Sequence, residues 1–274
     1  MGGEDVRKAI AHRKAEEVPP PSRAPEMRPS SAHAAGSDGD TVIPFTLARK
    51  QIAEHMVRSV YTSPHGYIAF DIDYGTIEDA RSQVKGRFRA DEGFGLTYLP
   101  FVCFALSKAL RAFPLINSRI DGDALVARRA INLGIAVDLS HNGLVVPVIR
   151  NADSLNVTGL ARTIADLARK ARENRLTAYD MADGTFTVTN PGPSGTYFSV
   201  PIINQPQTAI LVTDGVSRRP AVAHLTDGSE VLAICSMGII GLSMDHRAFD
   251  GAYAADFLAT LKNTLEGTDW RREL

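Results

Sequence analysis

Leu242-Ser243-Met244-Asp245-His246-Arg247-Ala248-Phe249-Asp250-Gly251-Ala252 ends an apolar run and passes into a polar turn. His246 lies four residues ahead of the Asp250-Gly251 pair. Upstream, Gly184-Thr185-Phe186-Thr187-Val188-Thr189-Asn190-Pro191-Gly192 places hydroxyls in an apolar stretch that precedes a turn. A base and a hydroxyl donor are the minimum groups needed to move an acyl group between thiols.

The composition is that of an ordinary globular protein. The chain has 274 residues, of which 44% are hydrophobic and 22% charged, with a formal net charge of -1. This length fits one large domain or two small ones, and the balanced charge gives no reason to expect nucleic acid or an anionic membrane as a partner. The chain has no signal-peptide core and no apolar run of about 18 residues. We therefore expect a cytoplasmic protein without membrane contact.

Several residue types that often carry chemistry indicate nothing here. Cys103 and Cys235 lie in apolar surroundings and are expected to be buried, reduced thiols rather than a disulfide. The seven histidines do not cluster with cysteines, so no metal site is expected. His65 is interpreted as a structural residue at the start of a strand. Neither a P-loop nor a G-x-G-x-x-G motif is present.

Composition divides the chain into three segments. Residues 1–17 are charged and favour a helix. Residues 18–41 contain five prolines and few apolar residues, which predicts a disordered linker. Residues 42–274 carry the alternating and helical apolar patterns of a compact domain. Its mixture of elements fits a two-layer α/β sandwich.

The apolar patterns of the compact domain predict individual elements. Helices are expected at 46–60, 76–88, 98–113, 155–173 and 252–265, and strands at 66–74, 130–138, 144–149, 186–189, 209–216 and 230–243. Arg218-Arg219-Pro220 is expected to end a strand.

The two opening motifs resemble those of the catalytic domain of dihydrolipoyl acyltransferases, the acyltransferase component of 2-oxoacid dehydrogenase complexes. Three further stretches also resemble family segments, in family order: Asn132–Asp138, Gly143–Ile149 and Pro201–Gln207. The resemblance covers about residues 42 to 268 and extends to residues 1–17, which resemble the last helix of the family's partner-binding domain. It implies a mixed β-sheet and a fold shared with chloramphenicol acetyltransferase.

The resemblance also implies residue roles. His246 would be the general base, for which the pKa of about 6.5 of an ordinary histidine is suitable, and Thr189 would donate a hydrogen bond to the oxyanion. Asp250 would pair with Arg49 and hold the turn that carries His246, although it could also orient the imidazole directly or cap the last helix. Asn190 and Gly251 would support the site. The alternative to a catalytic role for Thr189 is that of a structural strand residue whose hydroxyl bonds to a neighbouring backbone group.

Apolar side chains complete the expected site. Phe101, Phe186 and Phe198 are candidates to line the acyl pocket, with core packing as the alternative for each. Pro191 and Pro193 alter the usual family turn and could reshape that pocket.

The expected substrates are coenzyme A, as an acyl thioester or free thiol, and a lipoyl group on a separate domain or protein. The family's active site lies between subunits of a trimer, and the complex includes a decarboxylase component. The charged C-terminal stretch 268–274 favours a trimer over a core of 24 or 60 subunits. Leu96–Phe101 resembles branched-chain as well as acetyl-transferring members, so a branched-chain acyl group is only weakly preferred.

Two other functions stay open. The sequence shows no lipoyl domain ahead of the catalytic domain, so either that domain has been removed or the protein acts alone on a separate lipoyl or phosphopantetheine carrier in a biosynthetic pathway. It could also be a scaffolding core without catalytic activity, against which the intact His246, Asp250 and Thr189 argue.

Overall fold

The computed structural model describes residues 39–139, 143–224 and 227–274. Its residues fall into two units, Met1–Phe45 and Thr46–Leu274, and the second contains all the helices and strands of the described residues. The predicted segment 1–17 and most of the predicted linker 18–41 lie outside the described residues.

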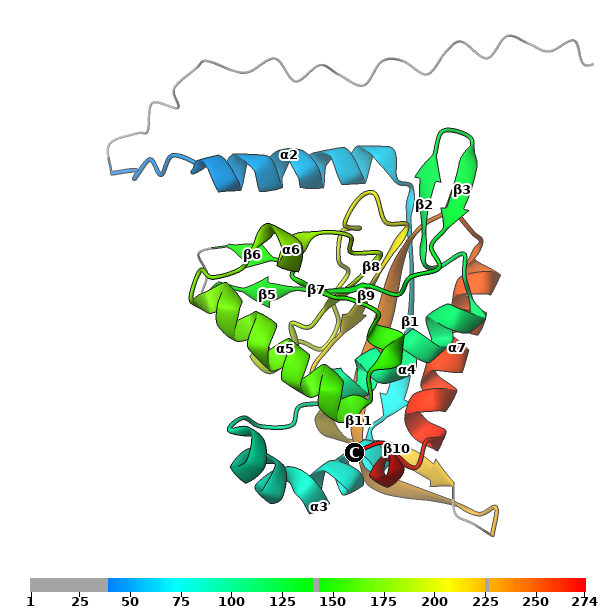
Figure 1. The fold of residues 1–274 in the computed structure, drawn as a ribbon. Coiled ribbons are helices and arrows are strands. Elements are labelled where there is room, and N and C mark those ends of the chain that lie inside the picture. Colours follow the sequence, from blue (N-terminus) through cyan, green and yellow to red (C-terminus); the bar gives the residue numbers. More distant parts are fainter. Residues whose placement is uncertain (1–38, 140–142, 225–226) are drawn as a thin grey trace, which may run out of the picture. The chain divides into compact units, whose positions relative to one another are not determined.

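Helices and strands are mixed along the described residues, with a run of short strands between the helices that end at Ala112 and begin at Val157, and the longest strand just before the last α-helix (Figure 1). The helices are α2 Leu47–Thr62, α3 Gly75–Glu92, α4 Leu99–Ala112, α5 Val157–Arg172, α6 Ala178–Met181 and α7 Gly251–Gly267, with 3₁₀ turns η1 Ala152–Ser154, η2 Gly192–Ser194 and η3 Trp270–Arg272. The strands are β1 His65–Asp73, β2 Ser118–Asp121, β3 Ala124–Ala127, β4 Leu133–Ile135, β5 Val137–Asp138, β6 Leu144–Val145, β7 Val148–Ile149, β8 Phe186–Thr189, β9 Ala209–Thr213, β10 Ser217–His224 and β11 Glu230–Asp245.

One mixed sheet organises the unit. In the described residues it has seven strands, in the order β1-β11-β9-β8-β4-β7, with β10 pairing to β11. The pairs β4–β8 and β8–β9 are parallel and the others antiparallel. The strands β2–β3 and β5–β6 form two small ribbons outside it. The expectation of an α/β fold with a mixed sheet is confirmed.

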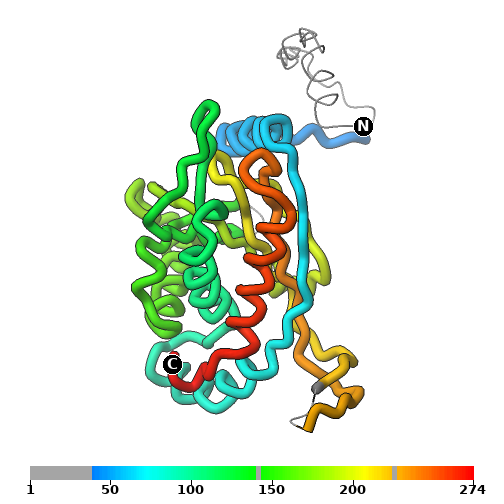
Figure 2. Tube along the Cα trace, turned by 90° about the vertical axis from the view of Figure 1, so that its right-hand side faces the viewer, coloured from blue at the N-terminus to red at the C-terminus, as the bar shows by residue number. Residues whose placement is uncertain are grey.

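The two faces of the sheet differ in chemistry because successive side chains of a strand point to opposite sides. The face that we call the helix face is apolar and forms the core with α4 and α7, which lie side by side (Figures 1 and 2). Its members include Ile72, Leu133, Phe186, Val188, Leu211, Ile240 and Leu242. The opposite face, the loop face, carries Tyr67, Thr187 and Ser243, and the segment 190–207 bonds to it.

The helices form where the sequence supplies caps and apolar faces. Thr46 begins α2 by accepting a hydrogen bond from the Arg49 amide. Helix α4 is almost entirely buried and ends before Pro114, which cannot continue it. Residues 46–60, 98–113, 155–173 and 252–265 were all correctly predicted as helices to within a few residues. No helix in the described ranges is long and apolar enough to span a bilayer.

The C-terminus folds back onto its own core. Trp270 is buried, packs edge-on against Phe101 with ring centroids 5.2 Å apart, and donates from Nε1 to the Leu265 carbonyl at 2.9 Å. The last residue, Leu274, accepts a hydrogen bond from Thr158 Oγ1 at 3.2 Å. This charged segment therefore contributes a buried aromatic anchor that its composition does not reveal.

Strand β11 is long enough to serve two purposes. Its second half pairs with β1 and β9, and its first half pairs with β10 as a hairpin that reaches away from the helices (Figure 1). Thr213 pairs with Ile240, and Ser217 pairs with Met237. The segment from Thr213 to Ser217 is therefore one residue longer than the segment of β11 that faces it, from Met237 to Ile240. The extra residue makes a bulge at 214–216, where a strand bends and twists.

Three strand expectations need correction. Arg218-Arg219-Pro220 does not end a strand but lies inside β10. The proline is accommodated because β10 is an edge strand with only β11 beside it. The single strand expected at 130–138 is divided into β4 and β5: the Ala136 amide still donates to the Val188 carbonyl of β8 at 2.9 Å, and from Val137 the chain pairs with β6 in a separate ribbon. The strand expected at 144–149 is divided in the same way, with β6 in that ribbon and β7 paired to β4 in the main sheet.

Candidate active site

His246 begins the turn that follows β11. Its backbone amide donates to the Pro64 carbonyl at 3.0 Å, and the Ala248 amide donates to the Asp245 carbonyl at 2.9 Å. The imidazole is 51% exposed. A β-carbon added to Gly66 would lie 2.7 Å from Met244 Cε and 3.4 Å from His246 Cδ2, so the glycine leaves room for the methionine beside the turn. The backbone is therefore fixed while the side chain stays open to a substrate.

Asp250 lies beside His246 but does not pair with it closely. Its Oδ1 is 3.9 Å from His246 Nδ1, and the carboxylate is 90% exposed. Asp250 is the N-cap residue of α7, yet its side chain makes no capping hydrogen bond. Gly251 is the first residue of that helix, and a β-carbon there would meet only Ile68 at 3.9 Å. Both residues thus lie at the junction between the turn and α7.

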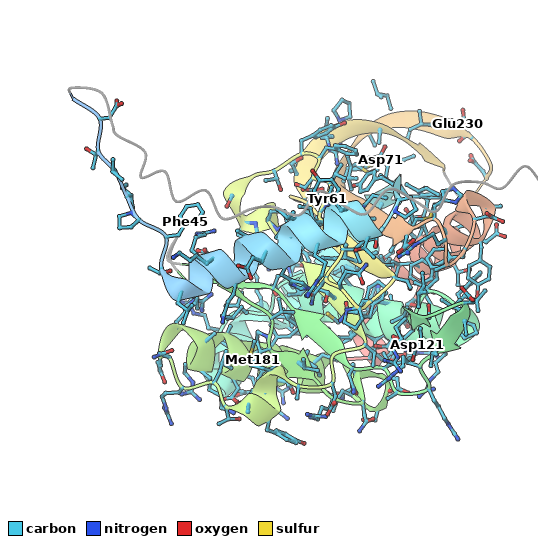
Figure 3. The ribbon with its side chains drawn as sticks, turned by 90° about the horizontal axis from the view of Figure 1, so that it is seen from above. Phe45, Tyr61, Asp71, Asp121, Met181 and Glu230 are labelled. Carbon is cyan, nitrogen blue, oxygen red and sulfur yellow. The ribbon has the colours of Figure 1, made fainter. Side chains whose placement is uncertain are left out.

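Arg49 does not form the expected ion pair within one chain. Among the described residues, none joins Arg49 to Asp250; the Arg49 amide instead bonds to Thr46 in the first turn of α2. The His246 turn instead contacts Pro64, which lies just after the carboxyl end of α2. A helix rises about 1.5 Å per residue, so Arg49 and Thr62 are roughly 20 Å apart along the axis. Figure 3 shows α2, with Tyr61 near its carboxyl end.

The charged group that does hold the turn is Asp245, which the sequence analysis did not single out. Its carboxylate is buried and accepts hydrogen bonds from the Arg247 amide at 3.0 Å, Nε at 3.0 Å and Nη2 at 2.6 Å. Burial raises the pKa of this carboxyl, but the bonds from Arg247 and from the Ser63 hydroxyl outweigh it, so its pKa lies below the usual value. The Asp-x-Arg spacing on either side of His246 is the signal that could have indicated this pair.

Thr189 is the last residue of β8 and is half-buried on the loop face. The next residue, Asn190, accepts a hydrogen bond from the Gly192 amide through Oδ1 at 3.1 Å, which closes the turn that leads into η2. A β-carbon on Gly192 would lie 2.8 Å from that oxygen and 2.9 Å from the Asp214 carbonyl. The backbone after Thr189 is therefore packed too closely for a side chain at 192.

Thr189 and His246 lie near opposite ends of the sheet along the direction of its strands, because β8 and β11 run antiparallel to each other. Thr189 pairs with Val212, Val212 pairs with Gly241, and Gly241 lies five residues before His246 on the chain. With about 3.3 Å per residue and 4.8 Å per strand, the two side chains are roughly 15–20 Å apart. Hydrogen-bond catalysis needs about 3 Å. One chain does not bring these two residues to the same substrate.

His65, the first residue of β1, connects that strand to the segment 190–207 on the loop face. Its Nε2 lies 3.1 Å from the Ile203 amide and its Nδ1 lies 2.8 Å from the Ser63 carbonyl. The Ile203 amide can only donate and the carbonyl can only accept, so Nδ1 carries the proton. Ser59 Oγ also donates to the Ile203 carbonyl at 2.6 Å. This pattern agrees with the expected structural role of His65.

The three phenylalanines expected near the pocket are placed differently. Phe101 and Phe186 are fully buried in the core, which matches the packing alternative for both. Phe198 is half exposed on the segment after Thr189 and meets the Tyr67 ring edge-on at 5.2 Å. Of the three, Phe198 alone is open to a substrate or a partner.

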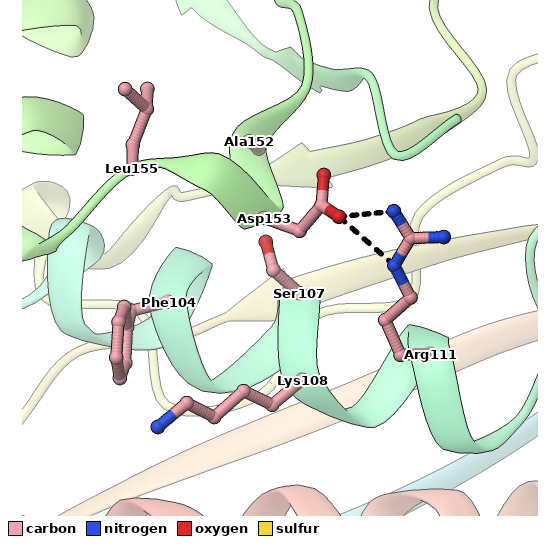
Figure 4. Close-up of a pocket in the computed structure, with 7 residues that line it drawn as sticks. All are labelled: Phe104, Ser107, Lys108, Arg111, Ala152, Asp153 and Leu155. Carbon is pink, nitrogen blue, oxygen red and sulfur yellow. Dashed lines mark hydrogen bonds and ion pairs between the residues drawn. The ribbon is translucent and has the colours of Figure 1, made fainter. Parts of the chain in front are cut away.

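A cavity of about 280 Å³ lies elsewhere, between α4 and the η1 turn (Figure 4). Its lining contains none of the predicted site residues, and an ion pair between Arg111 and Asp153 spans part of it. Its walls are Phe104, Ser107, Lys108, Arg111, Ala152, Asp153 and Leu155.

The two cysteines are free. Burial raises the pKa of Cys103 to about 12, whereas Cys235 is only partly buried, contrary to expectation, because it lies on the protruding hairpin. In the described part of the chain, no three His, Cys, Asp or Glu side chains gather as a metal site would require.

The family model of 2-oxoacid dehydrogenases acyltransferase (catalytic domain) matches residues 37–271. The chain is 38% identical over 252 residues to the Bacillus subtilis lipoamide acyltransferase component of the branched-chain alpha-keto acid dehydrogenase complex, covering 92% of this chain and 58% of that protein. It is 40% identical to the dihydrolipoyllysine-residue acetyltransferase component of the pyruvate dehydrogenase complex from the same species, covering 79% of this chain and 48% of that protein. The chain thus spans about half the length of these relatives.

Solved structures agree with the sequence matches. A probable dihydrolipoamide acetyltransferase from Listeria monocytogenes 4b F2365 superposes with a TM-score of 0.79 at 39% identity, covering 84% of this chain and 96% of that one. The cubic core of a pyruvate dehydrogenase multienzyme complex gives a TM-score of 0.78 at 32% identity, covering 89% and 98%. The histidine turn, the threonine strand end and the mixed sheet thus occur in a chain that belongs to the family of 2-oxoacid dehydrogenase acyltransferase catalytic domains.

Proposed function

We propose that the protein transfers an acyl group between coenzyme A and a dihydrolipoyl thiol as the acyltransferase of a 2-oxoacid dehydrogenase complex. The observation that carries the proposal is the His246 turn, in which a fixed backbone presents a half-exposed imidazole. The relatives named above are acyltransferases of such complexes.

His246 acts as the general base in this mechanism. Its Nε2, the nitrogen away from Asp250, takes the proton of the attacking thiol, and the sulfur forms a bond to the thioester carbonyl carbon. The carbonyl electrons move to oxygen, where the Thr189 hydroxyl donates a hydrogen bond to the oxyanion. When the oxyanion collapses, the original carbon–sulfur bond breaks and His246 returns its proton to the leaving thiolate. Correct base placement contributes typically about 10²- to 10⁴-fold.

The same mechanism requires two chains. Thr189 and His246 of one chain are too far apart to meet on one thioester, so Thr189 of one copy serves His246 of another. Exposed apolar side chains support such an assembly: Tyr197, Phe198, Val200 and Ile202 follow the Thr189 turn. On the hairpin, Leu232 is 80% exposed and lies opposite Val222, which is also exposed. Apolar surfaces of this kind mark interfaces between proteins. We propose a trimer as the smallest active unit.

The histidine spacing gives a further argument for these roles. The dihydrolipoamide acetyltransferase of Azotobacter vinelandii, which is 32% identical, has been investigated for the roles of a serine, a histidine and an asparagine in its catalytic mechanism, the last two being four residues apart. His246 and Asp250 have the same spacing, with a carboxylate in place of the amide. A threonine hydroxyl offers the same donor as a serine hydroxyl.

The relatives differ in the acyl group that they carry: branched-chain, succinyl and acetyl components all match. The deciding experiment therefore measures transfer from acetyl-, isobutyryl- and succinyl-coenzyme A to dihydrolipoamide, with wild type and His246→Ala compared at equal assembly state. The proposal expects transfer from at least one donor and a loss of about 10²- to 10⁴-fold in the variant. A correctly assembled wild type that transfers from none of the three, or a fully active variant, contradicts it.

A further inference from the structure

The carboxylate of Asp245 is unusual because it is buried and accepts several hydrogen bonds. Its side chain is 1% exposed, and four donors reach it: the Arg247 amide, Arg247 Nε, Arg247 Nη2 and the Ser63 hydroxyl. A buried charge is tolerated when it is paired and hydrogen-bonded. Nothing in the proposed acid–base chemistry uses this group, although it is the immediate neighbour of His246.

Two hydrogen bonds accepted by Asp245 close backbone turns that contain His246. Asp245 Oδ1 accepts from the amide two residues on, which forms an Asx turn around the histidine. The Asp245 carbonyl accepts from the Ala248 amide, which adds a β-turn over the same residues. With the bond from the His246 amide to Pro64, the backbone of the histidine has little freedom left.

The Asp245 site is also anchored to the rest of the domain. The Asp245 amide donates to the Thr208 carbonyl at 2.7 Å. The Ser63 hydroxyl, which bonds to the carboxylate, accepts a hydrogen bond from Gln205 Nε2. Residues from the end of α2 and from the segment before β9 thus hold Asp245, through its carboxylate, its backbone amide and the Ser63 hydroxyl, next to the residue that has to be placed most accurately.

We propose that Asp245 is a positioning residue for the transfer reaction. It fixes the direction in which His246 projects, through the fork formed by the two hydrogen bonds from the Arg247 guanidinium and through the bond from the Ser63 hydroxyl. The inference rests on the proposed role of His246 as the base. Asp245 touches neither substrate, and it acts only through the histidine. A base displaced by about 1 Å can lose about 10²-fold in rate.

The test compares Asp245→Asn with a matched control, Asp269→Asn. Asp269 forms the same Asp-x-Arg pair with Arg271 at 3.1 Å, but is exposed at the C-terminal 3₁₀ turn. An asparagine at 245 presents an NH₂ group where Arg247 and Ser63 donate, so part of the fork is lost. We expect kcat for acyl transfer to dihydrolipoamide to fall about 10- to 100-fold with KM for both substrates within about twofold. Asp269→Asn should match wild type.

The same substitutions in a His246→Ala background separate positioning from general damage. If Asp245 works only through the imidazole, Asp245→Asn costs nothing further once the imidazole is gone. Equal residual activities of His246→Ala and the double variant support the inference. A further loss in the double variant, or a fall in the activity of Asp269→Asn equal to that of Asp245→Asn, overturns it.

Ser63→Ala gives a second measurement should Asp245→Asn fail to fold. It removes one of the four donors, and Ser107→Ala, at a buried serine that bonds to the Cys103 carbonyl within α4, is its control. We expect a kcat loss of about 2- to 10-fold for Ser63→Ala alone, which disappears in the His246→Ala background. Full activity of Ser63→Ala and Asp245→Asn beside an inactive His246→Ala refutes this inference and leaves the proposed function intact. An active His246→Ala refutes the proposed function itself.

Discussion

Tyr67 crosses directly over Gly241. A β-carbon at position 241 would lie 1.8 Å from the Tyr67 hydroxyl oxygen, well inside any allowed contact. From there the hydroxyl donates to the Ser199 carbonyl at 2.7 Å, and so ties the segment that follows Thr189 to strand β1. Burial, assisted by the nearby Asp214 carboxylate, raises the pKa of Tyr67 to about 12, so the hydroxyl stays a donor at any physiological pH.

We therefore expect Gly241→Ala to displace Tyr67 and break its bond to Ser199. Overpacking of this kind typically costs about 1–3 kcal/mol. Chemical denaturation at fixed protein concentration measures the change. Gly86→Ala is the control, because no atom lies within 4 Å of a β-carbon there and helix α3 should gain about 0.5–1 kcal/mol. Equal stability of Gly241→Ala and wild type would contradict the crowding argument.

Thr189→Ala should lower kcat about 10²- to 10³-fold, because one oxyanion donor is removed. Thr189→Ser keeps the hydroxyl and should stay within a few-fold of wild type. Steady-state transfer to dihydrolipoamide with the best acyl donor gives both values. If the serine variant is as slow as the alanine variant, Thr189 contributes through packing and not through its hydroxyl.

Mixed assemblies test whether the active site is shared between chains. In a cyclic assembly of Thr189→Ala and His246→Ala chains, an intact threonine on one copy meets an intact histidine on the next. Random mixing at equal amounts makes about a quarter of the sites complete, so about a quarter of wild-type activity should appear in co-expressed protein. The two variants expressed separately should stay inactive. No recovery, in assemblies shown by mass spectrometry to contain both chains, would mean that the site does not combine Thr189 and His246 from different copies.

The Asp245 carboxyl should make stability depend on pH. Its pKa is lowered in the folded protein, so its stabilising effect is fully present above the unfolded value of about 3.9 and is lost as pH falls through the lower folded pKa. We expect Asp245→Asn to be less stable than wild type by about 1–3 kcal/mol at pH 7, with the gap narrowing below about pH 4. Urea unfolding of both proteins at several pH values measures the gap. A gap that is unchanged in acid would exclude the charge as its source.

Cys103 should not react with a thiol reagent in the native protein. Its sulfur is fully buried and its pKa is raised to about 12, so the reactive thiolate is almost absent at pH 8. Titration with Ellman's reagent should detect at most one thiol per native chain and both after denaturation. Two fast-reacting thiols in the folded protein would show that helix α4 opens readily.

Sequence patterns predicted the parts of this fold that depend on local chemistry. Helix α4 was predictable because a long apolar run stops at Pro114, and β8 was predicted with its observed bounds. The hairpin strand β10 was missed, because Arg218, Arg219 and Pro220 give it the polarity and the proline of a strand end. Its pairing with β11 is what makes it a strand, and pairing is not visible in a single segment.

The site was predictable in its residue types but not in its supports. His246 and Asp250 are neighbours through their spacing on one turn. The pair of Arg49 with Asp250 was expected from resemblance, and the length of α2 keeps them apart within a chain. The buried bond network of Asp245 was missed, because a charged residue after an apolar run is normally taken as exposed. The tertiary structure shows instead that the carboxylate is buried and bonded to Arg247 and Ser63.

Strand β11 runs without interruption from the exposed hairpin to the residue before His246, and this continuity limits where the chain can change in length. One inserted residue between Met237 and Asp245 would exchange the two faces of the strand, turning Leu242 out of the core and Ser243 into it. Insertions at the hairpin tip shift no residue of the paired segment. The stretch leading to the histidine therefore has to keep its number of residues.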